Sequence, residues 1–223
     1  MQKKPLHHVT KIEHPTTMKA DMGQKPWADI SAQTLSCFMG DPPSHRPVTR
    51  FKIAWDHHLV CVIFEVQDRY VRAVAKDYQD PVYQDSCVEF FFSPNPHVDS
   101  GYFNLEINCG GTGLFEFHPS TGGDVVPMPL DAFKRISILP TLGRNIDPEM
   151  RTPTTWSVEY TLPVDILADY CPVTPPAKGV FWRGNFYKCA DASSHPHWLT
   201  WAPVDFPRPR FHLPEYFGWL AFD

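Results

Sequence analysis

The chain has 223 residues and a formal net charge of −5, with 20% charged and 43% apolar residues, as in an ordinary globular domain. It contains no cluster of Lys and Arg and no run of 18 apolar residues, so neither nucleic-acid binding nor a membrane-spanning helix is expected. Its 24 prolines, more than twice the usual share of about 5%, predict many turns and short elements, because proline donates no backbone hydrogen bond.

Residues 1–25 are polar and show no periodicity, so we expect an extended lead-in ahead of a single domain at residues 26–223. The lead-in carries basic residues but lacks the apolar stretch of a secretory signal. A cytoplasmic location is therefore expected, unless a leader has been removed, in which case the protein would be periplasmic or secreted.

From residue 48 onward, short runs of β-branched and aromatic residues alternate with turns rich in Pro, Gly, Asp and Asn. One short helix is predicted at 163–170, with Pro163 in its first turn. Consecutive strands with few helices are typical of an all-β, antiparallel β-sandwich of the immunoglobulin or jelly-roll kind. The predicted strands are Val48–Trp55, Leu59–Gln67, Ser86–Ser93, Tyr102–Asn108, Gly113–Phe117, Phe133–Leu139, Thr155–Leu162, Gly179–Cys189, Trp198–Trp201 and Trp219–Phe222.

The six cysteines form no CxxC pair, and Cys61 and Cys87 lie within apolar, strand-like runs. A thiol in such a run usually behaves as a small buried apolar group. We therefore expect free thiols, which mildly favour a reducing compartment.

Three of the predicted strands carry well-separated polar and apolar faces, because successive side chains of a strand point in opposite directions. If the strands share a sheet, their polar faces join into one hydrogen-bonding patch. A solvated outer face is the simpler interpretation, but such faces usually carry Lys, Glu and Thr. The polar members are Glu89, Tyr102, Asn104, Glu106, Asn108, Arg183, Asn185 and Tyr187, and the apolar members are Val88, Phe90, Phe103, Leu105, Ile107, Val180, Trp182 and Phe186.

The last 42 residues hold four of the seven tryptophans, interleaved with polar residues and prolines. An aromatic core explains this density in part. A sugar site explains the mixture, because the C–H face of a sugar packs on an aromatic ring while its hydroxyls bond charged and amide groups. The rings that could stack a sugar are Trp201 and Tyr83, with Trp198 as the near alternative.

Three motifs are similar to those of the family-9 carbohydrate-binding modules and their stand-alone bacterial relatives. They are DSCVEFFFSP (Asp85–Pro94), YFNLEINCGGTG (Tyr102–Gly113) and the tail from WRGNFYKC to FGWLAF, and the resemblance spans residues 25–223. It implies a DOMON-related β-sandwich that clamps the terminal sugar of a glycan between two aromatic rings without cleaving it. It also implies a partnership with glycoside hydrolases and structural calcium, although the chain has no D-x-D-x-D-G loop.

The resemblance also assigns roles to residues of this chain. The family's first clamp Trp falls on Tyr83, whose ring is smaller, its Glu falls on Glu89, and its second clamp Trp falls on Trp201 or Trp198. No catalytic residue and no metal ligand is assigned. With the polar face of the strands added, the predicted ligand-binding residues are Tyr83, Glu89, Tyr102, Asn104, Glu106, Arg183, Asn185, Trp198 and Trp201.

Two other functions stay open. A glycoside hydrolase needs two facing carboxyl groups about 5–10 Å apart, which Glu89 and Glu106 could provide from adjacent strands, although no GxSxG, HExxH, P-loop or GxGxxG motif is present. Some DOMON relatives hold haem for electron transfer. The axial ligands available here are Met128, His118, Lys188 and the pair His195 and His197, which could also chelate a metal.

Overall fold

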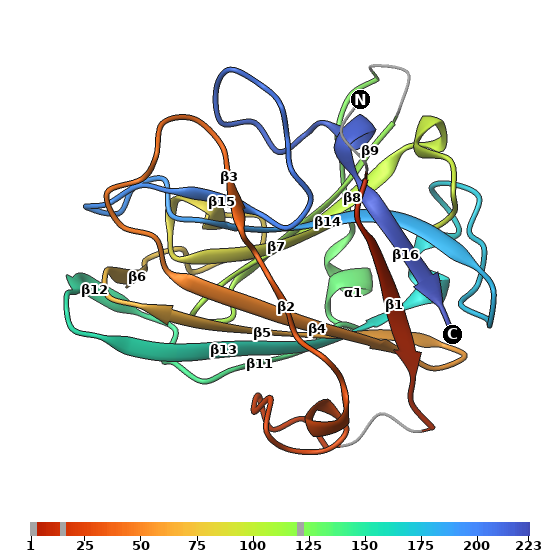
Figure 1. Ribbon diagram of the computed structural model, residues 1–223, viewed down its shortest axis with the longest axis horizontal. Helices are drawn as coiled ribbons and strands as arrows, with labels where there is room; N and C mark the ends of the chain where they lie inside the picture. The colour runs from red at the N-terminus through yellow and green to blue at the C-terminus, as the bar shows by residue number, and fades with distance from the viewer. Residues whose placement is uncertain (1–3, 14–16, 120–122) are drawn as a thin grey trace.

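Two curved β-sheets lie face to face and meet along one strand, β1 (Leu6–Lys11), as Figure 1 shows. The computed structural model describes residues 4–13, 17–119 and 123–223. The first sheet has the order β10-β9-β8-β7-β14-β16-β1, and the second continues as β1-β4-β5-β13-β11. β1 pairs in parallel with both β16 and β4, whereas the other described strand pairs are antiparallel.

The strands of the two sheets are mostly short, as the many prolines predict. The first sheet contains β3 (Cys37–Phe38), β7 (Cys87–Ser93), β8 (Tyr102–Asn108), β9 (Gly113–His118), β10 (Val126–Pro127), β14 (Phe181–Cys189), β15 (Trp198–Thr200) and β16 (Gly218–Phe222). The second contains β2 (Gln33–Thr34), β4 (Val48–Trp55), β5 (Leu59–Asp68), β11 (Ser137–Pro140) and β13 (Thr154–Pro163), and β6 (Val71–Ala73) pairs separately with β12 (Ile146–Met150).

The predicted mainly antiparallel β-sandwich is confirmed. β4 and β8 have the predicted bounds, and β5, β7, β9, β13, β14, β15 and β16 differ from them by one or two residues at an end. The strand predicted at Phe133–Leu139 is wrong in its first half. The one α-helix that the structure describes, α1 (Leu130–Phe133), ends at Phe133, and residues 134–136 form a turn before β11 begins at Ser137.

The helix predicted at 163–170 is wrong in type and length. Only Val164–Leu167 is helical, as a short 3-10 turn that begins directly after Pro163. Val164, Ile166 and Leu167 are all buried against the core, so tertiary packing at the end of β13 fixes this turn. The other 3-10 turns are Trp27–Asp29, Val82–Gln84, Val98–Ser100 and Pro214–Tyr216.

Residues near the N-terminus take part in both layers. The sequence analysis places residues 1–25 in an extended lead-in, and the structure places Leu6–Lys11 within the joined sheets. His7 and Val9 point inward while their neighbours stay exposed, so β1 has the alternation of a strand despite its polar sequence. Further along, the indole of Trp27 donates to Glu159 Oε1 at 2.9 Å and anchors the chain on the outer face of the second sheet.

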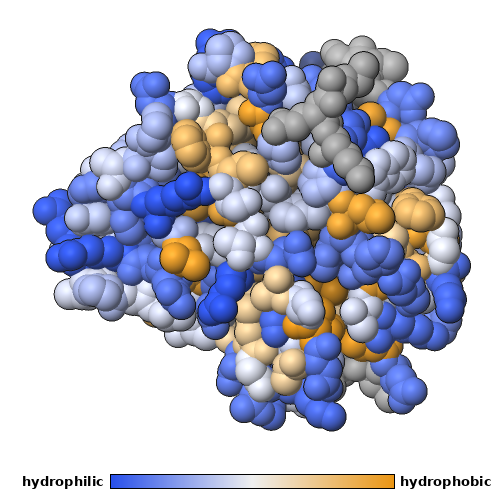
Figure 2. Space-filling model, in the orientation of Figure 1, coloured by the Kyte–Doolittle hydropathy of each residue, from blue (hydrophilic) through white to orange (hydrophobic). Residues whose placement is uncertain are grey.

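The core between the sheets is largely aromatic. Phe186 of β14 stacks on Phe90 of the same sheet at 4.5 Å between ring centroids and on Phe51 of the opposite sheet at 3.6 Å. All six cysteines lie in the described part of the chain and are free, as predicted. Hydrophilic residues cover most of the face shown in Figure 2, with hydrophobic residues in several separate groups. None of the described helices is long and apolar enough to cross a membrane.

Candidate functional site

Strands β7, β8 and β14 bring the predicted polar residues onto one face of the first sheet. Glu89 is opposite Glu106 in the register of β7 and β8, and opposite Tyr187 in the register of β7 and β14. The residues between them, such as Phe90 and Phe186, lie in the core on the other face. The alternation read from the sequence is therefore confirmed on these three strands.

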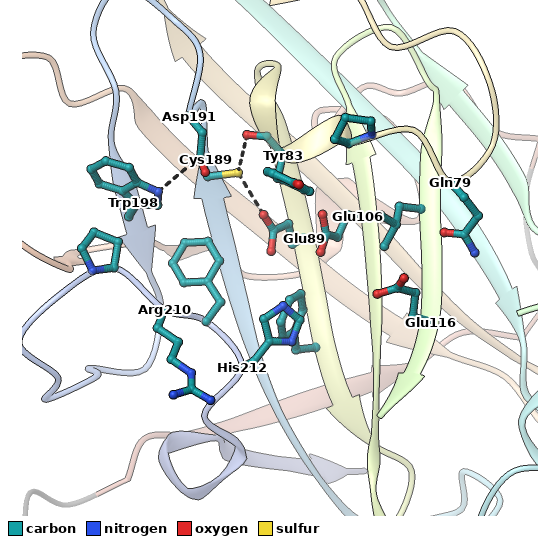
Figure 3. Close-up of a pocket in the computed structure, with 15 residues that line it drawn as sticks. Gln79, Tyr83, Glu89, Glu106, Glu116, Cys189, Asp191, Trp198, Arg210 and His212 are labelled. Atoms are coloured by element: carbon teal, nitrogen blue, oxygen red, sulfur yellow. Dashed lines mark hydrogen bonds between the residues drawn. The ribbon is translucent and has the colours of Figure 1, made fainter. Parts of the chain in front are cut away.

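This polar face is the floor of a pocket of about 430 Å³ (Figure 3). Its walls come from strand β9, from the turn at Val82–Gln84 and from a loop before the C-terminal strand. The lining residues are Gln79, Pro81, Tyr83, Glu89, Phe91, Glu106, Leu114, Glu116, Cys189, Asp191, Trp198, Pro209, Arg210, Phe211 and His212.

Two aromatic rings stand at the opening of the pocket. Tyr83 is 39% exposed, and Trp198 is partly exposed and donates its indole N–H to Asp191 Oδ1 at 2.7 Å. In Figure 3 these rings flank Cys189, with Glu89 and Glu106 deeper in the pocket and the side chains of Arg210 and His212 across from them. The pocket thus combines two accessible aromatic rings with a polar floor.

One carboxyl oxygen on the floor has no hydrogen-bond partner among the described residues. Glu106 Oε1 accepts a hydrogen bond from Asn104 Nδ2 at 2.9 Å, and Asn104 Oδ1 is bonded to His118 Nε2 at 2.9 Å. Glu106 Oε2 is buried and meets no hydrogen-bonding group among the residues that the structure describes. Because a buried polar atom without a partner is costly, this atom marks a place where a ligand could supply one.

Burial changes the protonation of the floor. It raises the pKa of Glu106 to about 8, although the hydrogen bond from Asn104 offsets part of the rise. Burial also raises the pKa of Glu89 well above its usual value, and Cys189 and Glu106 add to the effect. On the wall, the hydrogen bond from His118 lowers the pKa of Glu116. The floor therefore keeps protons that free glutamates lose, and a protonated carboxyl group both donates and accepts hydrogen bonds.

Four of the nine predicted ligand-binding residues line the pocket: Tyr83, Glu89, Glu106 and Trp198. Tyr102 and Asn104 lie on the same face of β8 as Glu106 but do not line the pocket. The Tyr102 ring stacks on His118 at 4.8 Å between centroids, and its hydroxyl is bonded to His212 Nδ1 at 3.1 Å. These two residues therefore hold pocket residues in position.

Trp201 lies in the core and is 7% exposed. It packs on the rings of Phe51 and Phe186, each 5.9 Å away between centroids. The reason is the alternation of the chain through β15, because residues three apart in an extended segment point to opposite faces. Trp198 consequently lies on the pocket face and Trp201 on the core face.

Arg183 and Asn185 share the polar face of β14 but lie outside the pocket. The Arg183 guanidinium donates to the carbonyl oxygens of Phe217 and Gly218 and lies 4.4 Å from the Trp219 ring centroid. The Asn185 amide donates to the carbonyl of Ala202 at 3.1 Å and accepts from its N–H at 2.8 Å. Both side chains hold the C-terminal segment on the sheet.

Sequence reasoning missed five polar lining residues: Gln79, Glu116, Asp191, Arg210 and His212. Glu116 could have been predicted from the sequence, because β9 alternates as its neighbours do. Glu116 is opposite Asn104 in the register of β8 and β9. Arg210 and His212 come from an irregular loop, where no periodicity indicates which way a side chain points.

The predicted haem and metal ligands are not gathered around the pocket. None of Met128, His118, Lys188, His195 and His197 lines it. Met128 is buried in the core, and the His195 ring stacks on Tyr70 at 3.6 Å between centroids. Lys188 Nζ is bonded to His197 Nε2 at 2.9 Å, while His197 Nδ1 is bonded to the carbonyl of His195.

Comparisons with known proteins agree on one family. The sequence model of carbohydrate-binding family 9 matches residues 25–222. A Bacteroides uniformis protein assigned to carbohydrate binding is similar over 99% of this chain and 100% of its own, with 27% identity and a TM-score of 0.86. No match exists among proteins of curated function.

The fold also matches a family-9 module from Caldicellulosiruptor kristjanssonii. Its complex with glucose has a TM-score of 0.66 and 13% identity, over 98% of this chain and 96% of the module. Its complex with cellotriose has a TM-score of 0.65 and 14% identity, over 98% and 93%. At this identity the likeness establishes the fold.

Proposed function

This chain belongs to carbohydrate-binding family 9, and we propose that its pocket binds the terminal sugar of a glycan without cleaving it. The observation that carries the proposal is the buried Oε2 of Glu106, which has no hydrogen-bond partner in the part of the chain that the structure describes and shares its pocket with two accessible aromatic rings. A sugar offers both complements at once, since its hydroxyls bond carboxyl groups and its C–H face packs on aromatic rings.

Tyr83 and Trp198 are the proposed clamp. Both line the pocket and keep ring surface accessible, whereas Trp201 is packed in the core. Glu89 and Glu106 would bind hydroxyls from the floor, and Glu116 and His212 from the wall. The volume of about 430 Å³ lies in the range of small-ligand pockets and suits one or two sugar units.

The protonation of the floor supports binding over hydrolysis. A glycoside hydrolase of the usual kind needs one protonated and one ionised carboxyl group facing the scissile bond. Burial raises the pKa of both Glu89 and Glu106, which disfavours the ionised form that one of the two carboxyl groups must take in a hydrolase. A separate glycoside hydrolase as partner remains a prediction from the family resemblance.

Calorimetric titration is the direct test. The panel is glucose, galactose, xylose, cellobiose, xylobiose and their reduced alditols, and it begins with glucose and cellobiose because the C. kristjanssonii module was solved with glucose and with cellotriose. We expect a saturable signal with at least one sugar, at about −4 to −8 kcal/mol, or millimolar to micromolar affinity. Loss of that signal with the alditol would locate recognition at the reducing end.

Two results would contradict the proposal. Release of reducing sugar from the oligosaccharides, lost in Glu89→Gln, would indicate a hydrolase. The absence of a binding signal with every sugar up to tens of millimolar would show that the pocket is not a site for terminal sugars.

A further inference from the structure

Two cysteines and a glutamate converge at the floor of the pocket. Cys87 and Cys189 are directly opposite each other in the register of β7 and β14, and Glu89 follows Cys87 by two residues on the same face. One ligand atom from each of the three side chains lies within 4.8 Å of both others, and in the described chain this is the one such group of His, Cys, Asp or Glu. Cys189 Sγ donates to Glu89 Oε1 at 2.9 Å.

This spacing suits a tetrahedral metal ion. Zn²⁺ binds cysteine sulfur at about 2.3 Å and carboxylate oxygen at about 2.0–2.2 Å. Those bond lengths separate two sulfur ligands by about 3.8 Å, so atoms that already lie within 4.8 Å need to move little. Sulfur ligands select thiophilic ions over Mg²⁺ and Ca²⁺, which prefer oxygen.

We propose that Cys87, Glu89 and Cys189 form a binding site for a thiophilic divalent cation such as Zn²⁺. Three protein ligands leave one tetrahedral position for water or a bound molecule. Glu89 and Cys189 line the pocket and Cys87 lies beneath them, so the free position is on the pocket side.

The surroundings supply part of the charge balance. Two thiolates and a carboxylate around a divalent cation carry a net charge of −1, which is costly to bury without a positive neighbour. Lys188 is fully buried on β14, where its Nζ donates to the carbonyl of Cys189 at 2.8 Å. Asp68 Oδ2, 3.7 Å from Nζ, shares this positive charge.

The first experiment titrates metal-free, reduced protein with Co²⁺ as a spectroscopic probe for Zn²⁺. We expect one equivalent to bind with the visible bands of tetrahedral cobalt and a sulfur-to-metal charge-transfer band, both removed by Zn²⁺. Cys87→Ser and Cys189→Ser should each lower the charge-transfer intensity per bound cobalt, because one thiolate remains, and should each weaken binding at least 10-fold. Glu89→Gln should weaken binding while retaining the sulfur band.

A matched control is Cys37→Ser, which removes the most accessible cysteine and should change nothing. If the serine variants do not fold, alkylation of the wild-type protein replaces them. Zn²⁺ should then protect Cys87 and Cys189, identified by peptide mapping, and leave Cys37 reactive. An octahedral cobalt spectrum, unchanged binding in folded Cys189→Ser, or a Cys87–Cys189 disulfide in protein isolated under reducing conditions would overturn the site.

The position of the free coordination site has a separate test, which rests on the proposed sugar binding. A sugar hydroxyl in that position should shift the cobalt bands, and one equivalent of Zn²⁺ should change the sugar affinity at least 3-fold. If cobalt binds but sugar does not shift its bands and Zn²⁺ does not change the sugar affinity, the proposed open coordination position is wrong and the three-residue metal site stands. Sugar binding without cobalt binding would overturn the metal site and leave the proposed function.

Discussion

The polar face of the first sheet divides into two halves that resemble each other in sequence and differ in structure. Near β16, Arg183 and Asn185 are buried and bonded to backbone groups of the C-terminal segment. Near β8, Glu89 and Glu106 are equally buried, yet Glu106 Oε2 meets no partner among the described residues and borders a pocket. The first half holds the fold together, and the second is left open for a ligand.

The type of a polar residue on a strand therefore does not by itself indicate a binding site. What distinguishes the two halves is whether the chain itself satisfies their hydrogen-bonding groups. The buried Arg183 guanidinium already donates to backbone carbonyls of the chain, whereas a buried carboxyl oxygen without a partner gains a hydrogen bond from a sugar hydroxyl. Substitutions in the two halves should therefore have opposite profiles of stability and binding.

The largest effect is expected in the satisfied half. Arg183→Met should lower the free energy of unfolding by about 3 kcal/mol, because it leaves two buried carbonyl groups without donors. Urea denaturation measures this loss, and Arg210→Met, at an exposed residue of the pocket, should cost less than about 0.5 kcal/mol. Equal losses would remove the proposed distinction between the halves.

The second prediction concerns how the stability of the half near β8 depends on pH. The folded chain holds a proton on Glu106 up to about pH 8, whereas the unfolded chain loses it near pH 4.5. Stability from this group is therefore full below pH 4.5 and is lost as the pH rises to about 8. In urea denaturation, Glu106→Gln should become more stable relative to the wild type by about 2 kcal/mol as the pH rises from 5 to 6.5. A constant difference between the two proteins would contradict the raised pKa.

Substitutions in the half near β8, which is open to a ligand, should change the affinity for sugar. Trp198→Ala should weaken sugar binding about 10- to 30-fold, or about 1.4–2 kcal/mol, because it removes one stacking surface. Calorimetric titration measures the change. Trp219→Ala is the matched control, since Trp219 stacks under Arg183 away from the pocket and should leave the affinity unchanged. A similar loss in both variants would point to a general change of structure.

The smallest effect on sugar affinity is expected from a substitution at Tyr83, the second ring of the proposed clamp. Tyr83→Phe keeps the aromatic face and should change the sugar affinity less than about 2-fold, or 0.4 kcal/mol. Tyr83→Ala removes the face and should weaken binding about 10-fold in the same titration. If Tyr83→Phe is as weak as Tyr83→Ala, the hydroxyl rather than the ring makes the contact.

Part of the site could be predicted because strand alternation is local. Glu89 and Glu106 lie on one face as the alternation predicts, whereas the sequence left open whether their strands share a sheet. The same alternation places Trp201 on the core face, because it lies three residues after Trp198 in an extended segment. Arg210 and His212 had no such signal, because their loop takes its shape from the surface on which it packs.

The alternation of most strands, the aromatic core, the free thiols and the family can all be read from the sequence. Each of these depends on residues near one another in the chain or on motifs in a fixed order. The joining of the two sheets by β1 depends on the folded chain. So do the bonds from Arg183 and Asn185 to backbone groups, and the lack of a partner for Glu106 Oε2 among the described residues. Hydrogen-bond satisfaction depends on groups such as Phe217 and Ala202, which folding alone brings to the sheet.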